Sequence, residues 1–204
     1  MIAEYYHGPR PVREVRAVYD AQTIRVYQAF DASVALPALE AQTFVPPFKF
    51  VISWASWIKP SFLWTMTRTA WGTQTRIGNK GRPEHKGNAF VLGIDVQRDF
   101  FDHILRIARS THYPEGYDKG EWKIRMREAQ AYIQWDPEKD LHGQRRDWKA
   151  IQIGLKTPVL QTYAESIVRI SDMRELISEI VETTAIEEKI NLLPDEVAYP
   201  MPSP

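Results

Sequence analysis

The segment Lys59-Pro60-Ser61 has the composition of an anion-binding helix start. Proline suits the first turn of a helix, and serine caps it. The free N–H groups of that turn and the positive end of the helix dipole attract a phosphate or a carboxylate. Capping alone explains Pro60 and Ser61. Lys59 has no structural need to be there, so it is the stronger candidate for a ligand contact.

An aromatic belt follows this helix start. Four of the seven tryptophans lie between Trp54 and Trp71. On a helix from Pro60 to Gly72, Trp64, Arg68 and Trp71 share one face, because they are spaced i, i+4 and i+7. Together they could stack a base or an adenine ring. The alternative is that these tryptophans belong to the core.

Two carboxylates, Asp136 and Glu138, are expected just past a strand. Acid–base residues and magnesium ligands often have this position. The alternative interpretation of these residues is a solvent-exposed Asp-Pro turn. Gln134 and Gln152, on two late strands, could face the same cleft as Gln28.

Two neighbouring strands near the N-terminus carry polar residues on faces where apolar ones fold more easily. Arg16 could clamp a phosphate or carboxylate through two hydrogen bonds, or pair with an internal aspartate. Gln28, on an otherwise apolar face, must find partners, either in the core or in a ligand. We therefore predict that Arg16, Gln28 and Lys59 share one pocket. Tyr27-Gln28 followed by a short helix is also similar to the opening of ADP-ribosyltransferase folds, in which a strand histidine would stand in place of Gln28.

Several classes of chemistry are excluded or disfavoured. The chain has no cysteine, which excludes disulfides, zinc–thiolate sites and cysteine nucleophiles. The five histidines show no metal-ligand spacing, and no P-loop, GxGxxG or GxSxG motif is present. No metal is therefore expected. No signal peptide and no apolar run long enough for a membrane span are found, so we expect an intracellular protein, cytoplasmic or nuclear, without membrane contact.

The charges are balanced, with 26 basic and 26 acidic residues. Nucleic-acid binding through the overall field is therefore expected to be weak and salt-sensitive. The glycine-rich segment from 72 to 88 is polar and basic, and we predict that it is a long loop.

The elements that must position these residues indicate an α+β fold. We expect a mixed or antiparallel sheet of about five or six strands, packed with four or five helices. One domain is expected over 1–190, with a loose proline-rich tail over 191–204. Strands are predicted over 12–20, 23–30, 89–96, 129–136 and 150–155. Helices are predicted from Asp31 or Ser33, over 60–72, from Asp99, over 157–170 and over 172–185, with a loop over 111–121.

Three segments resemble a known family: VRAVYDAQTIRVYQAF, WIKPSFLWTMTRTAWGT, and QWDPEKD followed by IQIGL. Together they are similar to the uncharacterised bacterial and fungal family called domain of unknown function 4291, over about residues 10 to 180. The resemblance implies membership without an assigned activity. The chain departs from the family pattern in a longer 73–88 segment and in FVISWA at 50–55, where an arginine and a methionine are expected before the tryptophan.

These residues lead to a functional hypothesis: an enzyme that binds a phosphate-bearing nucleotide, with ADP-ribosyl transfer from NAD as its most concrete version. In that version Arg16 and Lys59 hold the pyrophosphate. Tyr27 or a tryptophan stacks the nicotinamide, and Glu138 or Asp136 orients the ribose. The alternative is a non-catalytic module that contacts nucleic acid or protein through the aromatic belt and the basic loop.

Overall fold

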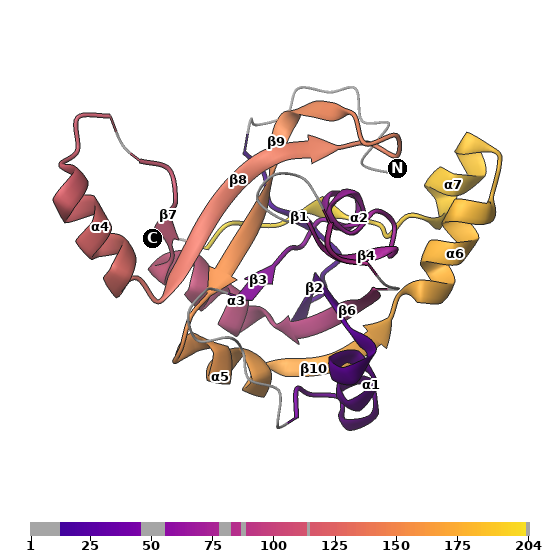
Figure 1. Ribbon diagram of the computed structural model, residues 1–204, viewed down its shortest axis with the longest axis horizontal. Coiled ribbons are helices and arrows are strands. Elements are labelled where there is room, and N and C mark those ends of the chain that lie inside the picture. Colours follow the sequence, from indigo (N-terminus) through magenta and orange to yellow (C-terminus); the bar gives the residue numbers. More distant parts are fainter. Residues whose placement is uncertain (1–12, 46–55, 78–82, 87–88, 114, 203–204) are drawn as a thin grey trace.

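The computed structural model describes residues 13–45, 56–77, 83–86, 89–113 and 115–202 (Figure 1). Its centre is a three-stranded antiparallel sheet in the order β10 (Ile167–Asp172), β6 (Phe90–Gln97), β2 (Thr23–Phe30). The predicted α+β class is confirmed, because this sheet and a second, mixed sheet pack with helices on both faces.

The second sheet has the order β3 (Ser56–Ile58), β9 (Arg145–Leu155), β8 (Ala131–Lys139), β7 (Arg109–Ser110). Only β7 runs parallel to its neighbour β8. A single antiparallel bridge joins the two sheets, because the Tyr27 N–H donates to the Lys59 carbonyl at 2.7 Å. Side chains that alternate along β2 therefore continue onto the same faces of β3, β9 and β8.

The main core fills one face of these sheets. The sequence of β6 is apolar except for Asp95 and Gln97, and all of its residues except Gln97 are buried, as expected of a central strand. Three helices close this face: α1 (Ala32–Ala41), α3 (Arg98–Ile107) and α5 (Val159–Glu165). Helix α3 contributes Phe100, Phe101, Ile104 and Leu105, which form the apolar stripe read from the sequence.

The opposite face is covered in part by α2 (Phe62–Thr69), α6 (Arg174–Glu182) and α7 (Ile186–Leu192). A second apolar cluster lies beneath them, formed by Tyr27, Phe62, Met66, Val91, Met173, Ile177, Ile180 and Leu193. Helix α4 (Lys119–Glu128) stands apart at the far side of the molecule, and none of its residues is buried (Figure 1). No described helix is long and apolar enough to cross a membrane.

Two predictions about loops and turns were wrong. The segment predicted as a long loop from 72 to 88 contains paired strands, β4 (Gln74–Ile77) and β5 (Pro83–Lys86). Asp136-Pro137-Glu138 is not a turn, because β8 continues to Lys139. The turn comes later, where the Asp140 side chain accepts the N–H groups of His142 and Gln144. An Asp and a Gly (Gly143, φ 73°) make that turn.

Two predictions near the C-terminus were also wrong. The helix predicted over 157–170 ends at Glu165, and the next residues form β10 against β6, where β-branched Ile167, Val168 and Ile170 suit a strand. The tail predicted to be loose contains the last residues of α7 and β11 (Val197–Ala198), which pairs with β1 (Arg16–Ala17). Tyr199 is buried against the main core.

Helix α4 begins inside the predicted 111–121 loop.

Candidate functional site

Strand alternation gathers polar side chains on the face that α2 partly covers. Gln134 lies opposite Gln152 in the β8–β9 register, and Asp136 follows Gln134 by two residues. Lys59 follows Trp57 by two residues past β3, so it lies on this same face. Because α2 begins immediately after Lys59, it adds Trp64 and Arg68 beside the sheet. Sequence-predicted residues from three elements therefore meet here.

Asp136 is held by two side-chain amides. Its carboxylate accepts from Gln134 Nε2 at 2.9 Å and from Gln152 Nε2 at 2.5 Å. These bonds fix the orientation of the carboxylate, and each of its oxygens has further acceptor capacity. Such a group can accept a proton or hold a hydroxyl of a ligand.

Lys59 and Arg68 approach the same indole. The Lys59 ammonium lies 5.6 Å from the centre of the Trp64 ring, and the Arg68 guanidinium also lies 5.6 Å from it. The Lys59 Nζ donates to the Trp57 carbonyl at 3.2 Å. In the part of the chain that the structure describes, no carboxylate lies within ion-pairing distance of either cation. Among the described residues, the pair therefore has no carboxylate in direct contact.

The electrostatics of Lys59 reflect this arrangement. Burial, and to a smaller extent the nearby charge of Arg68, lower its pKa from 10.5 to about 8, while Asp136 acts in the opposite direction. Lys59 is still mostly protonated at neutral pH, but its charge is poorly compensated. A bound anion would compensate both cations at once.

A small cavity adjoins Asp136 at the edge of β8. Its volume is about 240 Å³, and its lining comprises Arg13, Ser110, Thr111, His112, Gln134, Trp135, Asp136 and Lys149. Arg13 and Lys149 are brought together by a parallel bridge between their backbones. Asp136 and Gln134 thus connect the cations around Trp64 with a second cationic lining. Asp136 was one of the two catalytic candidates from the sequence, with Glu138, and it is the one that lines this cavity.

Gln28 and Ser61 have structural roles that account for them. The Gln28 amide donates to Ser56 Oγ and to the Trp57 carbonyl, and its oxygen accepts from the buried Tyr163 hydroxyl at 2.8 Å. Ser61 Oγ caps α2 by accepting from the Trp64 N–H. Gln28 is therefore a satisfied core amide, which was one of the two alternatives that the sequence left open.

Tyr27 cannot be the stacking surface for a ligand ring. It is fully buried beneath α2, with the Phe62 ring against its own at 5.5 Å. Its hydroxyl has no hydrogen-bond partner among the described residues. Burial raises its pKa well above the usual value, and the charge of Glu196 adds to that effect.

Arg16 and Glu138 belong to a separate buried group at the start of α2. Arg16 donates to the Glu196 carbonyl at 2.6 Å and pairs with Glu14 at 3.0 Å. The Glu196 carboxylate accepts the Phe62 N–H at 2.6 Å. Burial raises the pKa of Glu196, and the charge of Glu138 raises it further. Arg16 therefore anchors the C-terminal segment, and the predicted common pocket with Gln28 and Lys59 is not formed at Asp136, whose cavity contains none of the three.

Glu196 is the residue that the sequence did not indicate. It lies in the segment predicted to be loose, and no motif around it signals burial. Only the pairing of β11 with β1 brings it to the first N–H of α2.

The aromatic belt is largely part of the core. Trp64 is 6% exposed, and Trp71 packs against the Phe62 ring. Trp57 is half-buried and stacks on Tyr132 at 6.5 Å, on the same face as Asp136. Trp54 lies outside the described residues.

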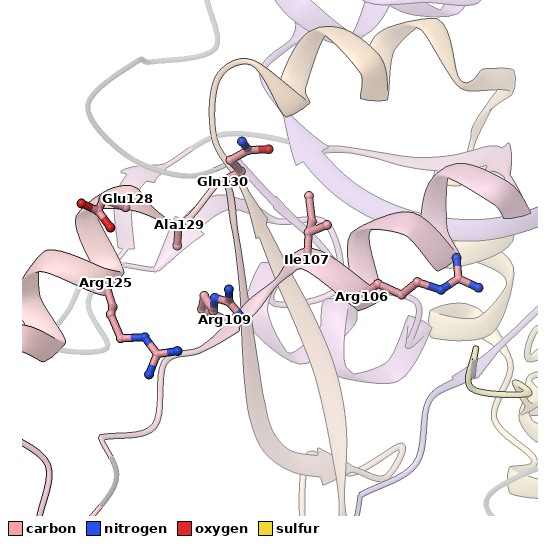
Figure 2. A pocket seen from close by; sticks show the side chains of 7 residues that line it. All are labelled: Arg106, Ile107, Arg109, Arg125, Glu128, Ala129 and Gln130. Carbon is pink, nitrogen blue, oxygen red and sulfur yellow. The ribbon is translucent and has the colours of Figure 1, made fainter. Parts of the chain in front are cut away.

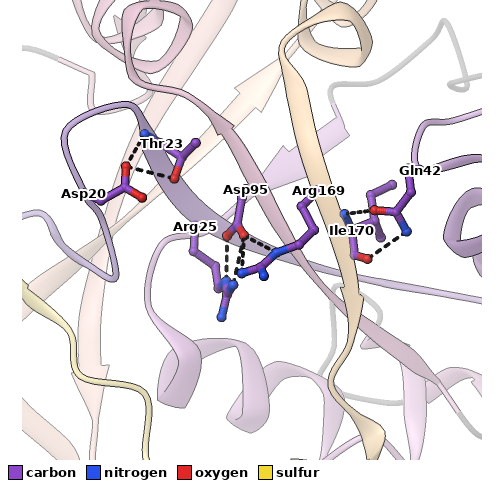
Figure 3. Close-up of polar contacts among 7 residues, drawn as sticks. All are labelled: Asp20, Thr23, Arg25, Gln42, Asp95, Arg169 and Ile170. Atoms are coloured by element: carbon purple, nitrogen blue, oxygen red, sulfur yellow. Dashed lines mark hydrogen bonds and ion pairs between the residues drawn. The ribbon is translucent and has the colours of Figure 1, made fainter.

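A third polar group on this side of the sheet is structural. Asp95 on β6 accepts from Arg25 at 2.7 and 2.9 Å and from Arg169 at 2.9 Å (Figure 3). These bonds raise the pKa of Arg25, with the hydrogen bond to Asp95 as the largest cause. Close by, the Gln42 amide bonds both backbone groups of Ile170 and so fixes the end of α1 to β10 (Figure 3). With its oxygens engaged by two arginines, Asp95 is a cross-strand anchor.

The comparison with protein families agrees with the resemblance found in the sequence. The model of a family described as a domain of unknown function, DUF4291, matches residues 14–199. A search of curated proteins finds no match to this chain. The matched range includes the sheet, α2 and every candidate residue named above except Arg13. The chain therefore belongs to the DUF4291 family.

Proposed function

We propose that this domain is an enzyme that binds a phosphate-bearing nucleotide on the face formed by β3, β9 and β8. The observation that carries the proposal is the pair of Lys59 and Arg68 around Trp64, which no carboxylate of the described residues contacts directly, near the amide-held carboxylate of Asp136. A cation whose pKa is lowered by burial and by a second cation gains most from a bound anion. Phosphate is the anion that such Lys and Arg groups bind best.

A nucleotide also brings rings and hydroxyls, and this face has partners for both. The half-buried stack of Trp57 and Tyr132 offers a flat surface to a base. The oxygens of Asp136 can accept from ribose hydroxyls. Gln28 and Tyr27 are left out of the proposal, because their side chains are engaged or buried.

ADP-ribosyl transfer from NAD is the reaction to test. The bond between the nicotinamide nitrogen and ribose C1′ breaks, and nicotinamide leaves with the bonding electrons. A nucleophilic oxygen or nitrogen of an acceptor forms the new bond to C1′, and its proton passes to Asp136 and then to solvent. This role for Asp136 is supported by its two amide partners, which hold the carboxylate in one orientation.

Two measurements test the proposal. The first is the shift in melting temperature on adding NAD or ADP-ribose; the second is release of nicotinamide from NAD. We expect Lys59→Met to abolish the thermal shift, and Asp136→Asn to retain it while losing nicotinamide release. Lys189→Met, on distant α7, is the control for loss of a positive charge. Absence of any shift in the wild-type protein, or an equal shift in Lys59→Met, would contradict the proposal.

The alternative of a non-catalytic binding module makes a different prediction. A protein of that kind would bind a nucleic acid or a protein without releasing nicotinamide. Its binding would be unaffected by Asp136→Asn.

A further inference from the structure

A second and larger cavity lies between the end of α3, β7 and α4. Its volume is about 390 Å³, and it is lined by Arg106, Ile107, Arg109, Arg125, Glu128, Ala129 and Gln130. Figure 2 shows that these side chains come from α3, β7, α4 and the link between α4 and β8, and that the Arg106 guanidinium points away from Arg109 and Arg125. Three of the seven are arginines and only one is acidic, so the lining is cationic.

Two of these arginines are available to a ligand. Arg109 is exposed, and Arg125 donates to the Tyr117 hydroxyl at 2.7 Å through one of its nitrogens. Within the described ranges, no carboxylate pairs with either guanidinium. A guanidinium has five donors in a planar fork, which matches the oxygens of a phosphate. The cavity is therefore suited to a phosphate group.

This cavity and the one at Asp136 lie along the same edge of the sheet. Strand β7 has only two residues: Arg109 lines the larger cavity, and Ser110 lines the smaller. Beside β7, Gln130, which precedes β8, lines the larger cavity, and Gln134 on β8 lines the smaller one. These two residues are about 13 Å apart along extended chain. The smaller cavity adds the cations Arg13 and Lys149. Lys149 is on β9, and Arg13 bridges it on the side away from β8, so a row of cations runs from β7 across the sheet to β9 and passes Asp136 on β8.

Aromatic side chains accompany the row. The segment between β7 and α4 carries Tyr113 and Tyr117, and both rings meet Trp122 edge-on, at 5.8 and 6.0 Å. Tyr113 is 37% exposed. Helix α4 contributes no buried residue, so packing in the core does not explain its presence. A cationic groove interleaved with aromatic rings is typical of proteins that bind single-stranded nucleic acid.

We infer that the edge formed by β7, β8 and α4 binds single-stranded nucleic acid and leads it to Asp136. Arg109 and Arg125 each contact a phosphate group, and Arg13 and Lys149 contact further phosphate groups along the strand. The inference deepens the proposed function and rests on it for one point only, that the strand is the acceptor at Asp136. Binding of the strand itself can be measured whether or not NAD is used.

The test is binding of fluorescent 12-nucleotide RNA and DNA strands, measured by anisotropy at several salt concentrations. We expect the wild-type protein to bind at low salt. Arg109→Met should weaken binding about fivefold near 0.1 M salt, and the double variant with Arg125→Met about 25-fold, since each lost phosphate contact lowers the salt slope by about 0.7. Lys189→Met should bind like the wild type. A preference for one of the two strands identifies RNA or DNA as the ligand.

Three results would overturn the inference. They are no binding of either strand at low salt, equal affinities for the double variant and Lys189→Met, and binding of vesicles with 30% anionic lipid in place of the strands. A folded double variant is verified by its melting temperature. Because Lys59 lies outside the row, Lys59→Met should keep strand binding while losing the NAD shift, so failure of one proposal is distinguishable from failure of the other.

Discussion

The substitution Lys59→Met tests how the free-energy cost of burying the Lys59 ammonium compares with the free energy of the contacts that the ammonium makes. The pKa of Lys59 is lowered to about 8 from 10.5. Each pKa unit corresponds to about 1.4 kcal/mol, so the charged form costs the folded state roughly 3 kcal/mol at pH 7. Methionine removes this cost and keeps most of the stem. It also removes the hydrogen bond to the Trp57 carbonyl and the contact with Trp64, together worth about 2–4 kcal/mol.

These terms nearly cancel at pH 7, so the two proteins should have similar free energies of unfolding there. The balance changes with pH. A group with a lowered folded-state pKa binds fewer protons when folded, so wild-type stability rises as the pH passes from about 8 towards 10.5. Relative to Lys59→Met, the wild-type protein should gain about 2–3 kcal/mol between pH 7 and pH 10.

Urea unfolding of both proteins at pH 7, 8, 9 and 10 measures this difference directly. Other groups that titrate in this range are common to both proteins and cancel in the comparison. Parallel stability curves would refute the reasoning, because they would show that Lys59 titrates normally. A loss of about 3–5 kcal/mol at pH 7 would instead reveal that Lys59 forms an ion pair with a residue outside the described ranges.

Three further substitutions test the buried polar groups. Glu196→Gln should flatten the pH dependence of the free energy of unfolding above pH 4.5. Because the pKa of Glu196 is raised in the folded state, its contribution to stability is fully present at low pH and is lost as the pH rises through the folded-state pKa. Urea titrations of both proteins across pH 4.5–9 would detect this difference. Gln28→Leu should lower the free energy of unfolding by about 2–4 kcal/mol, because it leaves the Tyr163 hydroxyl buried without its acceptor; an unchanged urea midpoint would contradict this. Tyr27→Phe should leave stability unchanged or raise it by about 1 kcal/mol, since its hydroxyl has no partner among the described residues; a fall in melting temperature would reveal one.

The sequence by itself determined the elements whose signals are local. The alternating run TIRVYQAF is β2 with the predicted bounds, and the apolar run from Ala89 gives the central strand β6. Ser61 caps α2 as predicted. Each signal is contained within a few neighbouring residues, which fix the backbone conformation before any distant contact forms. The family resemblance was confirmed for the same reason, because it rests on contiguous motifs.

Only the tertiary structure decided which polar residues share a face and which are already engaged. Gln28 and Lys59 were both candidate ligand contacts from the sequence. In the structure the Gln28 oxygen already accepts from Tyr163, 135 positions away, whereas no described carboxylate pairs with Lys59. Residues 167–170 were predicted to end a helix from their hydrophobic period, yet they form a strand, because pairing with β6 and their β-branched side chains outweigh that period. Glu196 is buried only because β11 pairs with β1 across the whole chain. Burial and pairing are set by distant partners, so hydrophobic period and residue type alone do not specify them.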